Sequence, residues 1–173
     1  MKKQQHLLRH FIWAYLIISL AACTPDSFED NIPDEINTPV SADFTSAFLN
    51  AVNAYRASGC ACGVQFMPPA PALQWDDQLT NAANRHANDM ATNDFFDHTG
   101  SDGSNSAERI SESGYNWQSV GENIAFGYND IQAVVDAWIT SEGHCRNIMN
   151  HNFTEMGAAS HGKYWVQTFG KPQ

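Results

Sequence analysis

The chain has 173 residues, of which nine are basic and 19 are acidic, and its formal net charge is −10 at pH 7. This length suits one ordinary domain with a core of its own. An acidic surface repels phosphate groups, so the charge argues against nucleic-acid binding and against charge-driven binding to anionic lipids.

Residues 1–22 predict an export signal. Lys2 and Lys3 form a basic start, and an apolar stretch then runs from Phe11 to Ala22. A membrane-spanning helix needs roughly 20 apolar residues, and this stretch has only about 12. The run Leu20-Ala21-Ala22-Cys23 resembles the lipobox of bacterial lipoproteins, which implies that Cys23 is acylated and becomes the first mature residue. A plain signal peptide with an incidental cysteine, or a short membrane anchor, is the alternative.

Residues 23–40 predict an acidic tether. The segment that follows Cys23 has five acidic residues, no basic residue and three prolines, which is a composition that cannot build a core. Because the signal holds three of the nine basic residues and none of the acidic ones, the chain from Cys23 onward has a formal charge of −13. Membrane attachment is therefore expected from acyl chains on Cys23 rather than from charge.

Residues 41–173 predict one folded domain that begins with helices. Apolar residues at helical spacing predict a helix between Ser41 and Gly59 and a second one from about Asp76 to Met90. Three prolines between residues 66 and 71 predict an extended loop. A short helix is expected to end near Gly114, and residues 131–139 form another helical face.

Strands are expected mainly toward the end of the chain. Residues 121–127 are apolar and bounded by glycines, which indicates a buried strand or a tight turn. Residues 163–169 have the aromatic and β-branched content of a strand, and residues 155–160 could pair with them through a turn at His161-Gly162. Together these elements predict an α+β fold around one sheet.

Three cysteines follow Cys23, namely Cys60, Cys62 and Cys145. A bridge between Cys60 and Cys62 would close a strained ring, whereas a bridge from either of them to Cys145 closes a loop of about 83 residues and stabilises by roughly 4–5 kcal/mol. We favour Cys62–Cys145, with three free thiols as the alternative. The spacing matches no four-ligand zinc pattern, so a zinc site on these thiols is a weaker hypothesis.

Three titratable residues stand out in apolar or glycine-rich surroundings, namely His98, Glu122 and His144. Two imidazoles and a carboxylate form a suitable zinc site that leaves one position for water. The alternative is that each residue satisfies its hydrogen bonds separately. If the helix through Trp138 continues, Ser141 and His144 lie one turn apart on the same side.

The chain from about Phe44 to Phe169 resembles bacterial members of the CAP superfamily, which includes cysteine-rich secretory proteins, antigen 5 and pathogenesis-related class 1 proteins. The likeness depends on many short motifs in the same order. They are Leu73-Gln74-Trp75, Phe95-Phe96-Asp97-His98, Asp102-Gly103-Ser104, Arg109-Ile110, Gly114-Tyr115, Gly121-Glu122-Asn123-Ile124-Ala125, Trp138 to Ser141, Gly143 to Met149, Phe153 to Gly157 and Tyr164-Trp165-Val166-Gln167.

This resemblance implies a three-layer α-β-α sandwich with a central antiparallel sheet. It also implies a cleft with two histidines and two glutamates that binds zinc or another divalent ion in several members. His98 matches the first histidine and Glu122 the first glutamate. The chain departs from the pattern at the second glutamate, which is Ser141, and at the second histidine, which is Tyr164. Bacterial members have a histidine at the position of His144, and it could replace the missing one.

Three functions follow from the resemblance. The first is a lipid-anchored, extracytoplasmic binding module of the cell envelope, at the outer membrane or cell surface, with a metal-binding cleft and a lipid or protein ligand. Several aromatic residues could line an apolar groove or belong to the core, namely Phe95, Phe96, Tyr115, Trp117 and Trp165. The second is a hydrolase that uses Ser141, His144 and Glu122, or a metal-bound water. The third is an envelope-structural protein with a vestigial cleft. A binding protein without enzymatic activity is the favoured prediction.

Overall fold

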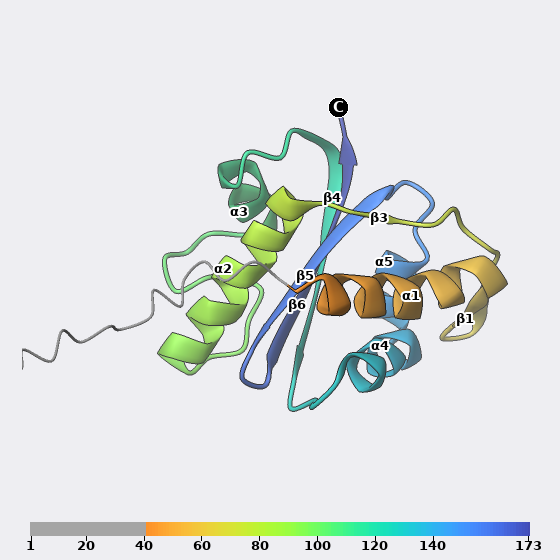
Figure 1. Ribbon diagram of the computed structural model, residues 1–173, viewed down its shortest axis with the longest axis horizontal. Helices are drawn as coiled ribbons and strands as arrows, with labels where there is room; N and C mark the ends of the chain where they lie inside the picture. Colours follow the sequence, from red (N-terminus) through yellow and green to blue (C-terminus); the bar gives the residue numbers. More distant parts are fainter. Residues whose placement is uncertain (1–40) are drawn as a thin grey trace, which may run out of the picture. The chain divides into compact units, whose positions relative to one another are not determined.

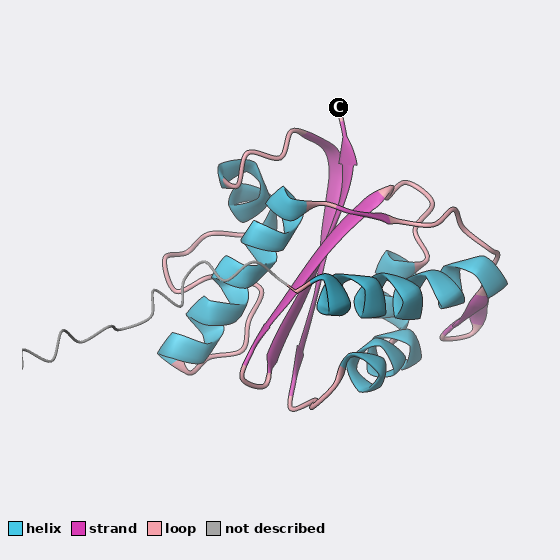
Figure 2. Cartoon of the chain, viewed as in Figure 1, coloured by secondary structure: helices cyan, strands magenta, loops and turns pink. Residues whose placement is uncertain are grey.

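The computed structural model describes residues 41–173. The predicted signal, the acidic tether and Cys23 lie outside the described residues. The described chain contains five helices and six strands in two sheets (Figures 1 and 2). The helices are α1 (Ala42–Ser58), α2 (Asp77–Asn93), α3 (Ser106–Glu112), α4 (Ile131–Thr140) and α5 (Glu142–Ile148). The strands are β1 (Cys60–Cys62), β2 (Gln65–Met67), β3 (Gln74–Trp75), β4 (Trp117–Phe126), β5 (Glu155–His161) and β6 (Tyr164–Pro172).

The larger sheet has four strands in the order β3-β5-β6-β4. Strands β5 and β6 form the predicted hairpin, in which His161 pairs with Tyr164 and Gly162 adopts a positive φ of 59° that favours glycine. Strand β4 pairs antiparallel with β6, whereas the short β3 runs parallel to β5. The segment 121–127 is therefore mostly strand rather than turn, and it lies at one edge of the described sheet.

Helices cover both faces of this sheet, which confirms the predicted three-layer arrangement. Helix α2 packs on β5 and β6, while α1, α4 and α5 lie on the opposite side (Figure 1). The alternation of side chains along β4 matches these two layers. Ile124 packs in a small cluster with residues of α2, and the next residue, Ala125, packs in the large cluster with Trp138 of α4.

The two long helices begin at the predicted caps. The Ser41 hydroxyl accepts a hydrogen bond from the Phe44 amide at 3.2 Å, and the Asp76 carboxylate accepts one from the Leu79 amide at 2.8 Å. Such caps satisfy backbone donors that the first turn leaves without partners. Within residues 41–173, no helix is both long and apolar enough to span a bilayer.

The predicted Cys62–Cys145 disulfide is present, with a Cα–Cα distance of 5.4 Å, and Cys60 is a free, half-buried thiol. The bridge joins α5 to β1. Strands β1 and β2 form a two-stranded sheet that we did not predict from the sequence. Phe66 and Met67 belong to β2, so the expected extended loop begins only at Pro68.

The aromatic residues proposed for a groove are mostly core residues. Tyr115 and Trp165 are 4% and 5% exposed, and Phe95 and Trp117 pack against core clusters. Phe96 is the exception, because it is 51% exposed.

The helix through Trp138 does not continue to His144. Helix α4 ends at Thr140, and Ser141 is extended, with φ −92° and ψ 119°, before α5 begins at Glu142. Ser141 is the N-cap of α5, where its carbonyl accepts a hydrogen bond from the Cys145 amide at 2.8 Å, so Ser141 and His144 do not lie on a continuation of α4.

Candidate functional site

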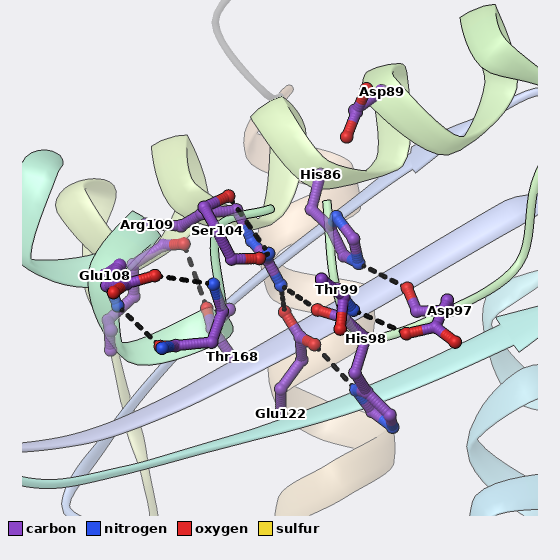
Figure 3. Close-up of polar contacts among 12 residues, drawn as sticks. His86, Asp89, Asp97, His98, Thr99, Ser104, Glu108, Arg109, Glu122 and Thr168 are labelled. Atoms are coloured by element: carbon purple, nitrogen blue, oxygen red, sulfur yellow. Dashed lines mark hydrogen bonds and ion pairs between the residues drawn. The ribbon is translucent and has the colours of Figure 1, made fainter. Parts of the chain in front are cut away.

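Glu122 and His98 form the centre of the candidate site. Glu122 projects from β4, and its side chain is only 3% exposed. His98 follows α2, where Asp94 ends the helix in a left-handed conformation with φ 51°. The distance between His98 Nδ1 and Glu122 Oε1 is 2.7 Å (Figure 3). Because a carboxylate accepts, the Nδ1–H of His98 donates this hydrogen bond.

Arg109 of α3 holds the other oxygen of Glu122. Its Nη2 donates to Glu122 Oε2 at 2.8 Å and to the His98 carbonyl at 2.9 Å (Figure 3). Its Nη1 donates to the Ser104 carbonyl at 2.7 Å. The Arg109 side chain is 2% exposed, so this guanidinium balances the charge of a buried carboxylate and fixes the loop that carries His98.

His86 of α2 supports the same loop from the other side. It is fully buried, and its Nε2 lies 2.9 Å from the Asp97 carbonyl. Burial lowers the pKa of His86, so the ring is neutral and donates its Nε2–H to that carbonyl. His86 and Arg109 therefore hold the two peptide groups that flank the Cα atom of His98.

His144 belongs to α5, which packs against β4 through amide side chains. Asn147 Nδ2 donates to the Glu122 carbonyl at 3.1 Å and to Asn123 Oδ1 at 2.9 Å. Asn123 Nδ2 donates in turn to the His144 carbonyl at 3.3 Å. These bonds place the His144 backbone beside the same part of β4 that carries Glu122.

The two imidazoles have opposite protonation behaviour. The pKa of His98 is raised, above all by its hydrogen bond to Glu122. The pKa of His144 is lowered by burial and, to a lesser extent, by the positive charge of His98.

The structure brings the predicted residues together only in part. His98 and Glu122 are in direct contact, whereas for His144 the hydrogen bonds place only the backbone close to β4. Within residues 41–173, the three do not form a group whose candidate ligand atoms all lie within 4.8 Å of one another. Their assignment as a three-ligand metal site therefore stays a prediction.

The donors present nevertheless suit a divalent ion in a different arrangement. Histidine ligands commonly donate one N–H to a carboxylate, which leaves the other ring nitrogen free to bind metal. His98 has this arrangement, and its side chain is 56% exposed. Both oxygens of Glu122 are already engaged, by His98 and Arg109. Glu122 thus fits the role of orienting His98, and the imidazoles of His98 and His144 fit the role of ligands.

The hydrolase hypothesis gains no geometric support. Ser141 lies between two helices, and among the described residues its hydroxyl makes no hydrogen bond to His144 or Glu122. A serine nucleophile needs a base within hydrogen-bonding reach. Glu122 does not supply that base, because its two oxygens accept hydrogen bonds from His98 and Arg109.

Sequence analysis assigned no role to Arg109 or His86, although both are essential to the geometry. One local signal was available for Arg109. Asn105 and Glu108 have the spacing of a capping box, and both of its hydrogen bonds form at the start of α3. This motif fixes where α3 begins, and so predicts that Arg109 and Ile110 lie side by side in its first turns. It does not show that Arg109 meets Glu122.

An exposed aromatic cluster lies on the same side of β4 as Glu122. Phe126 is 52% exposed, its ring centroid is 4.7 Å from that of Tyr164, and the Phe96 centroid is 6.3 Å away. Glu122 and Phe126 are four residues apart on one strand, so their side chains leave the same face.

The sequence is similar to a known family and to two curated proteins. The Cysteine-rich secretory protein family (CAP) matches residues 49–169. Two Bacillus subtilis (strain 168) proteins, the uncharacterized membrane protein YlbC and the uncharacterized protein YkwD, are 35% and 36% identical to this chain over 99 residues. The matches cover 57% and 56% of this chain but 29% and 38% of those proteins, so the chain spans about a third of the length of these curated relatives.

Solved structures show the same fold. An extracellular protein containing an SCP domain from Bacillus anthracis str. Ames has a TM-score of 0.61 and 25% identity, over 78% of this chain and 45% of that one. An outer surface protein from Borrelia burgdorferi has a TM-score of 0.66 and 20% identity, over 79% and 98%. A cysteine-rich secretory protein from Staphylococcus aureus has a TM-score of 0.59 and 16% identity, over 78% and 41%.

Proposed function

Because this chain belongs to the Cysteine-rich secretory protein family, we propose that it is an extracytoplasmic binding protein with a cleft for one divalent cation, zinc foremost. The proposed ligands are the imidazoles of His98 and His144. Acylated Cys23 would anchor the protein to a membrane of the cell envelope. An extracellular and an outer surface protein among the structural relatives support this compartment.

The contact between His98 and Glu122 is the main support for the cation site. It directs the Nδ1–H of His98 to Glu122, so that Nε2 has a free lone pair once the pH exceeds the raised pKa of His98, and Arg109 keeps Glu122 in place. The lowered pKa of His144 keeps that ring neutral at pH 7, so it too has a lone pair to offer. When present, the cation would act as a Lewis acid and would polarise an oxygen atom of the molecule bound in the cleft.

The exposed aromatic cluster of Phe96, Phe126 and Tyr164 suggests the other half of the ligand. Exposed aromatic side chains beside polar groups are typical of binding surfaces. We propose a ligand with an apolar part that contacts these rings and a polar part that reaches His98 and His144.

Calorimetric titration of the metal-stripped full chain with zinc tests the cation site. The chain carries Cys23→Ser, which removes both the lipid attachment point and the Cys23 thiol. We expect one zinc ion per chain and loss of binding in His98→Ala/His144→Ala. Glu122→Gln should weaken binding about 10-fold to 100-fold, because the orientation of His98 is lost. His151→Ala is the matched control, since His151 is an exposed histidine away from these contacts. Full-affinity binding by the double variant contradicts the proposal.

Membrane fractionation tests the anchor. The Cys23→Ser chain should move from the membrane to the soluble fraction, because it cannot be acylated. An unchanged distribution means that Cys23 is not the attachment point.

A further inference from the structure

A cluster of three sulfur atoms lies between β1 and α5, and the cation site proposed above makes no use of it. Cys60 and Cys62 are two residues apart in β1, so their side chains leave the same face of the strand. Cys145 of α5 faces them. The distance from Cys60 Sγ to Cys145 Sγ is 3.6 Å, and all three Sγ atoms lie within 4.8 Å of one another.

The distance from Cys60 to Cys145 suits a trigonal thiolate site. Metal–sulfur bonds of about 2.3 Å place three sulfurs around one ion about 4 Å apart. The 3.6 Å between the Cys60 and Cys145 sulfurs is close to that value, whereas Cys62 and Cys145 are bonded to each other and must move apart when the bridge is reduced. Among residues 41–173, this is the one set of three or more histidine, cysteine or acidic side chains with such spacing.

The surroundings favour a soft cation. Cys62 and Cys145 are fully buried, and Cys60 is half-buried, so the cluster is shielded from water but can be reached past Cys60. Thiolates select soft ions such as Cu(I), and a three-coordinate sulfur set suits Cu(I) better than zinc, which prefers four ligands.

The disulfide between Cys62 and Cys145 controls whether the site exists. We propose that reduction of this bridge by a dithiol converts the cluster into a three-thiolate site for one soft cation, Cu(I) above all. The dithiol supplies two electrons and two protons and becomes a disulfide, while Cys62 and Cys145 become thiols. On binding, the cysteines release their protons to solvent.

Other contacts hold the two elements in place when the bridge opens. Arg56 of α1 donates to the Ile148 carbonyl at 2.6 Å, and Asn147 bonds to β4, so α5 is fixed at its end. Strand β1 is paired with β2 through Cys60↔Met67 and Cys62↔Gln65. The three sulfurs therefore stay near one another without the covalent bond.

The test uses the full chain with Cys23→Ser, reduced by a phosphine under anaerobic conditions and offered Cu(I) from a bathocuproine complex. We expect transfer of one Cu(I) per reduced chain, a sulfur-to-copper absorption band in the ultraviolet, and three sulfurs in the X-ray absorption spectrum. The oxidised chain should take up none at this site. Cys60→Ser is the matched variant, because it keeps the Cys62–Cys145 pair, and it should lose the complex. His98→Ala/His144→Ala should retain it, which separates this site from the proposed zinc site.

Equal Cu(I) uptake by the reduced parent and by reduced Cys60→Ser overturns the proposal, as does equal uptake by the oxidised parent. Circular dichroism covers the case in which reduction unfolds the chain. Cu(I) should then restore the folded spectrum of the parent but not of Cys60→Ser, and failure to restore it also overturns the proposal.

Discussion

The two faces of the sheet are stabilised in different ways. On the side of α1, α4 and α5, a large apolar cluster built around Phe48, Trp138 and Trp165 is joined to a buried disulfide. On the side of α2 and α3, two smaller apolar clusters flank the buried ion pair of Arg109 and Glu122.

The two sides therefore depend on different kinds of contact. Apolar burial is non-directional and scales with area, so the first side needs only side chains of suitable size. A buried ion pair needs each donor aimed at its acceptor, and it is costly when one partner is missing. The proposed ligand His98 rests on that second kind of support, through its contacts with Glu122 and Arg109.

The largest effect is expected from Phe48→Ala on the apolar side. Phe48 is fully buried, and its ring lies 6.1 Å from that of Trp138 and 6.5 Å from that of Trp165, measured between centroids. Because the change leaves a cavity, we expect the free energy of unfolding to fall by about 3–5 kcal/mol, measured by chemical denaturation.

Phe126→Ala is the control for this change, since it removes the same ring from an exposed position. We expect a loss of about 1 kcal/mol or less. Similar losses at the two positions would mean that the apolar cluster is not the main source of stability.

A somewhat smaller effect is expected from Arg109→Met on the polar side. The substitution removes the positively charged partner of the buried Glu122 carboxylate. It also leaves the His98 and Ser104 carbonyls without the hydrogen bonds that Arg109 donates. We expect a loss of about 3 kcal/mol, at the low end for a broken buried pair because Glu122 keeps its bond to His98. Zinc affinity should fall as well, whereas Phe48→Ala should leave the affinity of the folded fraction unchanged.

Two further variants test the cause. Arg109→Met/Glu122→Gln should recover much of the lost stability, because no unpaired buried charge remains. Arg85→Met removes exposed ion pairs to Asp102 and Glu112 and should cost only about 0–1 kcal/mol. If the double variant is no more stable than Arg109→Met, lost packing rather than charge explains the effect.

The apolar side was largely predictable from the sequence, and the polar side was not. The spacing of Phe44, Phe48 and Val52 is a local pattern that predicts α1 and its buried face by itself. The β5–β6 hairpin also has local signals, in its strand residues and its His161-Gly162 turn. Because a bridge between Cys60 and Cys62 would be strained, Cys145 is expected to form one end of the disulfide. Strain alone does not choose between Cys62 and Cys60 as the other end.

The contacts around Glu122 have no comparable local signal. Arg109 and Glu122 come from a helix and a strand whose packing depends on the whole domain, so no spacing between them predicts a 2.8 Å contact. The break at Ser141 was missed because the apolar helical pattern leads directly into it. Strands β1 and β2 have three residues each, which is too short for a period of two to be recognised.

The smallest effect is expected in the titration of the two proposed ligands, His98 on the polar side and His144 in α5. The pKa of His98 should lie above 6.5 and that of His144 below it, and Glu122→Gln should lower the His98 pKa because the main cause of its rise is removed.

Since the folded pKa of His98 exceeds its unfolded value, its contribution to stability is complete below about pH 6.5 and is lost as pH rises through the folded pKa. The contribution of His144 to stability has the opposite pH dependence, because it is complete above about pH 6.5 and is lost as pH falls through the lowered folded pKa. Histidine NMR titration of the metal-free chain measures both values. If His98 has a lower pKa than His144, Glu122 does not hold the His98 ring in solution. The two faces of the sheet would then differ only in how much apolar surface they bury.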